Sequence, residues 1–97
     1  MVVKISNFGE VLMSRPAGRE AFLMANAYVF KELSQDDEIV LDFDDVKVLA
    51  PSWADEFISG VRRDYLNEIH YINTENPSVK ASLKTVLEED MDTRPIR

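Results

Sequence analysis

The sequence predicts a single α/β domain with about three helices and a mixed four-stranded sheet that is largely parallel. Short β-rich runs alternate with segments of helical periodicity along the chain, a pattern typical of this class. The apolar fraction of 45% and the charged fraction of 30% are ordinary for a globular protein, and 97 residues suit one domain. The expected element order is β-β-α-β-α-β-α, in which strands joined through helices make right-handed crossovers.

The first third of the chain is predicted to form a β-hairpin followed by a helix. The two strands are expected at residues 2–5 and 11–13, on either side of a turn at residues 7–9. Pro16 fits the first turn of a helix that is capped at Ser14 or Arg15. Apolar residues then recur at helical spacing, which extends this helix to about Leu33.

The segment of residues 39–61 organises the rest of the chain, because it joins an apolar strand to a helix through a short acidic loop. Residues 39–43 are apolar apart from Asp42. Such a run suits a strand covered on both faces, and we expect it at the centre of the sheet. Binding or chemistry is therefore expected where this strand meets the helix.

The helix after the central strand is expected to begin at Ser52. Pro51 lacks a backbone N–H and favours extended backbone before it, so the strand path must end there. Ser52 is a preferred N-cap residue, and Asp55 stands where a capping box has its acidic residue. Apolar residues at helical spacing then carry the helix to about Leu66.

The C-terminal third is predicted to hold one strand and one helix. Residues 69–73 form a short apolar run, and Asn76 followed by Pro77 is a helix start with its cap. The third helix is amphipathic and completes a domain over residues 1–88. Residues 89–97 lack a period, and we expect a flexible acidic tail there.

Composition excludes several classes of function. A formal net charge of −7 and a pI near 4.6 disfavour nucleic acids and anionic membranes, since both attract clustered Lys and Arg. The chain has no cysteine, no apolar run near the roughly 20 residues of a membrane helix and no signal peptide, so we expect a cytoplasmic protein. His70 is the single histidine, and we expect neither a metal site nor a cofactor.

Asp42 and Asp44 carry one catalytic alternative. An apolar strand that ends in Asp-x-Asp also holds the nucleophile and acid/base of Mg²⁺-dependent phosphatases of the haloacid-dehalogenase type. Strand alternation would point both carboxylates to one face. Such enzymes need a longer α/β domain after the motif, whereas 55 residues follow Asp42 here. We therefore expect no enzymatic activity, with this phosphatase as the remote alternative.

Four stretches of the chain, taken in this order, point to a known family. They are Arg15, Gly18 and Arg19 near the start of the first helix, LDFDDV in the central strand, SWADEF in the next helix and IHYIN in the last strand. Together they resemble STAS domains, the fold of bacterial anti-sigma-factor antagonists, and most closely a STAS-like branch of bacterial domains. The resemblance covers most of residues 10–88 and implies a STAS-like α/β sandwich.

The resemblance also implies a regulatory role for Ser52. In the antagonists, an anti-sigma-factor kinase phosphorylates a Ser or Thr at the N-terminus of the helix after the central strand, and Ser52 occupies the matching position. The implied partner is a serine kinase or anti-sigma factor of the histidine-kinase-like ATPase class. A helix N-terminus tolerates a phosphate, whose charge of about −1.5 to −2 would repel a partner. The simpler interpretation of Ser52 is a helix cap.

Further residues are candidates for partner contact, each with a structural alternative. They are Trp53, Asp55, Glu56, Asp44, Asp45, Arg15 and Arg19. Trp53 either packs in the core or anchors a partner. Asp55 and Glu56 either complement the helix dipole or dock on a basic patch. Arg15 and Arg19 either bind an anion or pair with nearby acidic residues.

A second hypothesis belongs to a different functional class. Open α/β sheets bind ligands at the carboxyl ends of their strands. The chain could therefore be a sensor for a small molecule or nucleotide, bound in the groove between the central strand and the second helix. A partner switch requires a binding protein without turnover, whereas a sensor requires a thermal shift on ligand addition.

Overall fold

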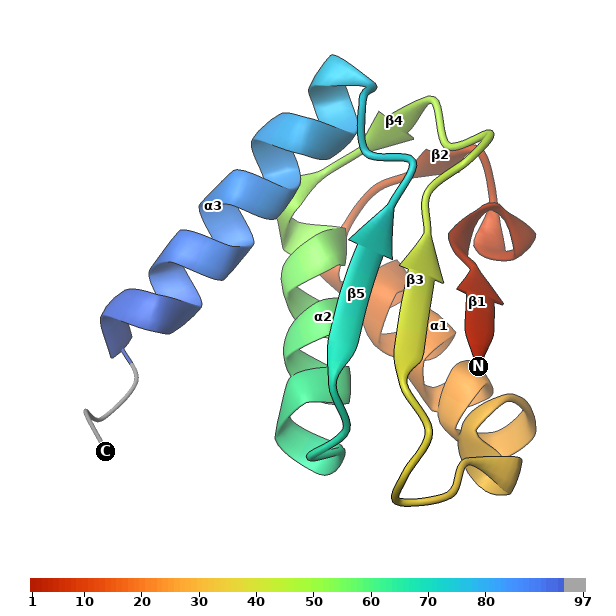
Figure 1. Cartoon of the computed structure of the whole chain (residues 1–97). Helices are drawn as coiled ribbons and strands as arrows, with labels where there is room; N and C mark the ends of the chain where they lie inside the picture. Colours follow the sequence, from red (N-terminus) through yellow and green to blue (C-terminus); the bar gives the residue numbers. More distant parts are fainter. Residues whose placement is uncertain (94–97) are drawn as a thin grey trace.

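The computed structural model describes residues 1–93 and, within them, the side chains of residues 1–88. Its main sheet has three parallel strands in the order β1-β3-β5 (Figure 1). These strands are β1 (Val2–Lys4), β3 (Ile39–Asp42) and β5 (Ile69–Ile72). In the register, Leu41 of β3 lies between Val3 and Tyr71. The prediction of a central strand in this segment is confirmed.

The described residues form three α-helices, as the sequence predicted. They are α1 (Arg15–Tyr28), α2 (Pro51–Asp64) and α3 (Pro77–Thr93). Figure 1 shows α1 and α2 together behind the sheet. Helix α3 packs against α2 and contacts β4. None of the helices over residues 1–93 is both long enough and apolar enough to cross a membrane.

A second, two-stranded sheet stands in place of the predicted hairpin. β2 (Val11–Leu12) pairs in parallel with β4 (Val48–Leu49) and not with β1. A 3-10 helix, η1 (Ile5–Phe8), and Gly9 with its φ of 137° carry the chain away from the main sheet before β2 begins. The predicted hairpin and the single mixed four-stranded sheet are therefore wrong. A turn signal in the sequence does not specify with which strand the segment after the turn will pair.

The strand β4 was missed, so the observed order contains β3 and β4 in succession before α2. The sequence of the segment that holds β4 predicts a short acidic loop instead. Only Leu49 of this two-residue strand is buried, and its backbone is fixed by β2 on one side and by the Ser78 hydroxyl on the other. A strand this short has too little periodicity to predict one from the sequence.

Two of the three described α-helices, α1 and α3, begin where a capping residue in the sequence predicts their start. Ser14 caps α1, since its Oγ accepts a hydrogen bond from the Ala17 N–H at 3.3 Å. Asn76 precedes α3, and its Oδ1 accepts from the N–H groups of Ser78 and Val79 at 2.8 and 3.2 Å. Helix α1 ends at Tyr28 and a separate 3-10 turn follows, so the first helix is shorter than predicted.

The main sheet is covered on one face, not on both. Along β3 the side chains alternate between buried and half-buried, with Ile39 and Leu41 fully buried. The other face carries Val2, Val40 and His70 side by side in register, and Val2 is 64% exposed. The prediction of coverage on both faces is wrong, because α1 and α2 lie on the same side of the sheet.

The predicted boundary between the domain and its tail, after residue 88, falls inside α3. Helix α3 continues into the predicted tail as far as Thr93. Residues 94–97 lie outside the described residues, so the flexibility of the tail stays a prediction.

Candidate functional site

Ser52 lies in the first turn of α2, but it does not cap the helix. The helix begins at Pro51, so Ala50 is the N-cap residue and provides no side-chain hydrogen bond. Ser52 is half-buried at the second helical position. The predictions of a Ser52 cap and an Asp55 capping box are wrong, because Pro51 takes the first helical position and the cap therefore falls two residues before Ser52, at Ala50.

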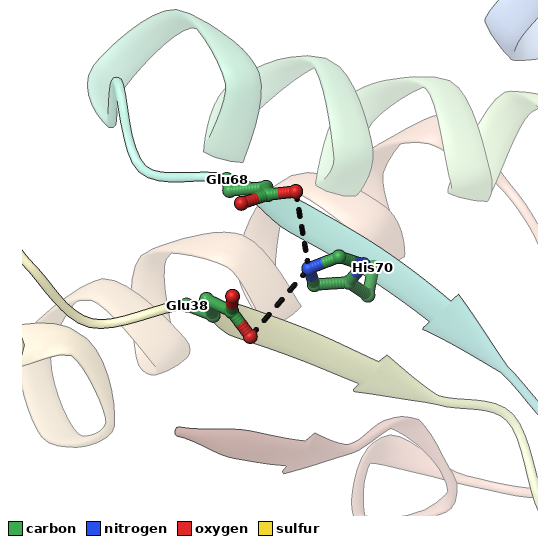
Figure 2. Close-up of side chains that lie close together, drawn as sticks. All are labelled: Glu38, Glu68 and His70. Carbon is green, nitrogen blue, oxygen red and sulfur yellow. Dashed lines mark ion pairs between the residues drawn. The ribbon is translucent and has the colours of Figure 1, made fainter.

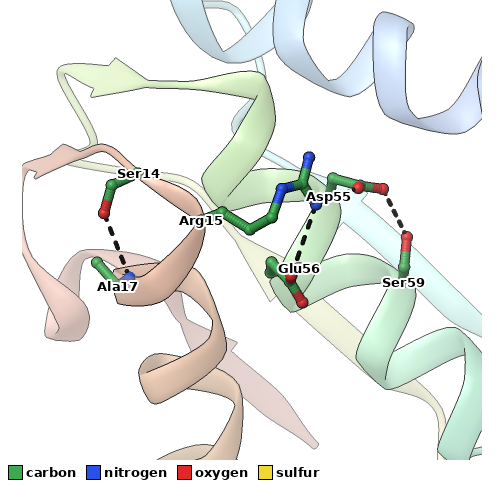
Figure 3. Close-up of polar contacts among 6 residues, drawn as sticks. All are labelled: Ser14, Arg15, Ala17, Asp55, Glu56 and Ser59. Carbon is green, nitrogen blue, oxygen red and sulfur yellow. Dashed lines mark hydrogen bonds and ion pairs between the residues drawn. The ribbon is translucent and has the colours of Figure 1, made fainter.

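The start of α2 is tied to the start of α1 by an ion-pair cluster (Figure 3). Arg15 contacts the carboxylates of Asp55 at 2.7 Å and Glu56 at 3.6 Å. The hydrogen bond with Asp55 is the main cause of the raised pKa of Arg15. Asp55 also accepts a hydrogen bond from the Ser59 hydroxyl at 3.0 Å. Arg15 is therefore engaged with α2, and Ser59 is a member of the cluster that was missed although its i,i+4 spacing signals it.

Trp53 belongs to the core. Its side chain is 2% exposed and stacks on Phe57 with ring centroids 5.1 Å apart and an interplanar angle of 11°. Gly18 of α1 lies directly over its backbone, where a Cβ on residue 18 would be 2.6 Å from the Trp53 carbonyl oxygen. The interpretation of Trp53 as a surface anchor for a partner is wrong, and the core alternative holds.

The acidic loop after β3 is held by its own first residue. Asp42 accepts hydrogen bonds from the Asn73 side-chain amide at 2.8 Å and from the Asp44 N–H at 3.0 Å. These bonds, the one from Asn73 first, lower the pKa of Asp42. Asp44 lies in a turn beyond the end of β3, so strand alternation does not relate it to Asp42. Asp42 thus joins the loops that follow β3 and β5.

The other two charged candidates lie on the surface. Asp45 has a φ of 67° in the same turn and pairs with Lys4 at 3.6 Å. Arg19 is exposed on α1, one helical turn after Arg15. Asp44 and Asp45 follow β3, whereas Arg19 is on α1, so the candidates do not form one compact cluster.

A cleft of about 360 Å³ lies beside β2 and α1. Its lining includes Phe8, Val11, Met13, Ala17, Met24 and Trp53. A ligand groove was expected elsewhere, between β3 and α2. The cleft is largely apolar in its residues, and Val11, Met13 and Met24 are each more than half exposed. A space of this size suits a small ligand or the side chains of a partner.

The structure is a small parallel α/β domain in which Ser52 lies in the first turn of the helix that follows β3 and β4. The family model described as "STAS-like domain of unknown function (DUF4325)" matches residues 27–79, more than half of the chain. The chain belongs to this family, and the suspected resemblance is confirmed. The matched region holds β3, β4, α2 and β5, including Ser52. Searches of curated proteins and of solved structures return no match.

Proposed function

We propose that this STAS-like domain is a non-enzymatic regulatory module that binds a protein partner through the surface around Ser52. Phosphorylation of Ser52 weakens this binding. The observation that supports the proposal is the half-buried Ser52 in the first turn of a helix without a side-chain cap. The N–H groups of such a first turn and the helix dipole stabilise an anion.

A phosphate on Ser52 would disturb the ion pairs that Arg15 makes with Asp55 and Glu56. Ser52 and Asp55 are three residues apart on α2, so their side chains lie on neighbouring positions of the helix surface. A phosphate on Ser52 adds a charge of about −1.5 to −2 beside the pair of Arg15 and Asp55. It would compete for the Arg15 guanidinium and repel the carboxylates of Asp55 and Glu56. The charge and the geometry of the surface with which this domain binds its partner would therefore change together.

The proposed partner is a serine kinase or anti-sigma factor of the histidine-kinase-like ATPase class, in the cytoplasm. This assignment extends from the family resemblance. The net charge of −7 and the exposed acids Asp44 and Asp45 favour a partner with a basic surface. Phosphorylation would then act mainly through repulsion at the rim of the contact.

The test is a pull-down from the native host with wild type, Ser52→Ala and Ser52→Asp, followed by intact-mass measurement. We expect wild type and Ser52→Ala to capture a kinase of this class and Ser52→Asp to lose it. A fraction of the wild-type chain should carry one phosphate that Ser52→Ala lacks, and the unphosphorylated fraction captures the partner. Thr85→Asp is the matched control, because it adds the same charge on the exposed surface of α3 and should keep the partner.

Equal recovery of the same proteins by all four chains, without phosphate on wild type, would contradict the proposal. The cleft beside β2 and α1 supports a small-molecule sensor as the second candidate. A sensor would show a rise in melting temperature with a nucleotide or metabolite, since a ligand that binds only the folded state stabilises it. The Mg²⁺-dependent phosphatase has less support, because the Asp42 carboxylate is engaged with Asn73 and the loop backbone.

A further inference from the structure

Three potential metal ligands meet at the beginning of two adjacent strands, at the end of the main sheet opposite to the start of α2 (Figure 1). Glu38 precedes β3 and Glu68 precedes β5. Ile39 and Ile69 pair across the strands, and the Ile39 N–H donates to the Glu68 carbonyl oxygen at 2.8 Å. The two glutamates are therefore neighbours on fixed backbone. His70 lies two residues after Glu68, so it points to the same face of β5.

The distances in this cluster suit a single cation (Figure 2). The His70 Nε2 atom lies 3.6 Å from Glu38 Oε2 and 3.5 Å from Glu68 Oε1. A Zn²⁺ ion about 2.0–2.1 Å from tetrahedral ligands holds them roughly 3.3 Å apart. One ligand atom from each side chain lies within 4.8 Å of the others. Small rotations of the side chains would bring all three onto one ion.

The imidazole has an unfilled bonding position that faces the carboxylates. His70 Nε2 is buried at the atom level and has no hydrogen-bond partner among the side chains and backbone that the structure describes, although the ring itself is partly exposed. A buried nitrogen without a partner carries a free-energy cost that a ligand would remove. The two carboxylates, which lie side by side just before neighbouring strands, also repel each other, and a cation would relieve this repulsion.

We propose that Glu38, Glu68 and His70 bind a divalent transition-metal ion of the Zn²⁺ type. A ligand set of one imidazole and two carboxylates favours such an ion over Mg²⁺ and Ca²⁺, which take oxygen ligands alone. Three protein ligands leave a further position on the ion for water or for a group from another molecule. The ion would join the beginnings of β3 and β5, far from the surface around Ser52, so this site is independent of the proposed partner binding.

The test is calorimetric titration of ZnCl₂ into the wild-type chain, with MgCl₂ as the comparison. We expect one Zn²⁺ per chain and much weaker binding of Mg²⁺. Glu38→Gln and His70→Ala should each weaken Zn²⁺ binding by at least about tenfold, because each removes one of three ligands. Glu75→Gln makes the same change on an exposed residue beyond the far end of β5 and should bind Zn²⁺ as wild type does. Ser52→Ala should also bind it unchanged.

Circular dichroism of each variant establishes that it is folded, and all the substituted positions are at least partly exposed. The proposal is overturned if wild type binds no Zn²⁺. In that case the cluster is only a contact between the imidazole and the two carboxylates. It is also overturned if Glu38→Gln and His70→Ala bind Zn²⁺ as tightly as wild type, since the ion would then occupy another site.

Discussion

At the scale of single residues, Asn76 and Ser52 differ in their position relative to a proline at the start of a helix. The residue before the proline can cap the helix, whereas the residue after it is already helical. Asn76 precedes Pro77, and its carboxamide oxygen accepts two N–H groups of the first turn of α3. Its amide nitrogen also donates to the carbonyl oxygens of Val46 and Lys47 at 3.3 and 3.1 Å. Ser52 follows its proline and lies inside the helix. The two side chains therefore differ in their contribution to stability.

We predict that Asn76→Ala lowers the free energy of unfolding by about 1–2 kcal/mol, because a cap and two loop hydrogen bonds are lost. Ser52→Ala should change it by less than about 0.5 kcal/mol, as is usual for a surface substitution away from a cap. Urea denaturation of both variants and wild type measures this difference. If Ser52→Ala lowered the free energy of unfolding as much as Asn76→Ala does, Ser52 would contribute to stability as a cap does, which would contradict its position inside α2.

At the scale of elements, the contact between α1 and α2 depends on two small residues. Gly18 of α1 faces backbone, since a Cβ there would meet the Trp53 carbonyl oxygen at 2.6 Å and its Cα at 2.9 Å. Gly60 of α2 faces a side chain, since a Cβ there would meet the ring of Phe22 at 2.9–3.0 Å. A ring can shift within the core more easily than a helix backbone can.

We therefore predict that Gly18→Ala destabilises the protein and that Gly60→Ala does so less. Overpacking costs roughly 1–3 kcal/mol, and the better helix propensity of alanine returns about 1 kcal/mol at either position. The expected loss at Gly18 is at the upper end, because α1 and α2 must move apart. Thermal denaturation of wild type and of the two variants provides the comparison, and equal melting temperatures for Gly18→Ala and Gly60→Ala would contradict the larger cost predicted at Gly18.

At the scale of the whole molecule, stability should depend on pH through carboxylates with lowered pKa. The Asn73 amide and the Asp44 N–H lower the pKa of Asp42 from 3.8, and the Ser34 N–H lowers that of Asp37. A group with a lowered pKa in the folded state binds fewer protons there than in the unfolded chain. Its contribution is complete above the unfolded pKa and disappears as the pH falls through the folded pKa.

We predict that the free energy of unfolding decreases as the pH falls below about 4, where the unfolded aspartates begin to bind protons. Asp42→Asn should make this decrease shallower, because it removes one of the titrating groups. Asp36→Asn, in the loop beside Asp37 and exposed, is the control and should keep the wild-type slope. Urea denaturation between pH 3 and pH 7 measures the slopes, and identical slopes for Asp42→Asn and wild type would contradict the role of Asp42.

The fold class, the three helices and the central strand were predictable because each rests on a local signal. The Asn76 cap was predicted for the same reason, the cap of α1 was narrowed to Ser14 or Arg15, and the start of α2 was displaced by only one residue. The strand β4 and the pairing of β2 were not predictable, since two-residue strands carry almost no period and pair with segments far along the chain.

The sequence by itself determined the α/β class, the STAS-like family and the position of Ser52 at the start of a helix, because periodicity, proline and short motifs act over a few neighbouring residues. Only the tertiary structure decided that Trp53 is core, that Arg15 holds Asp55, and that one face of the sheet stays open. It also decided that Glu38 and His70 meet. Such contacts join residues up to 40 positions apart, and strand register and helix packing set them.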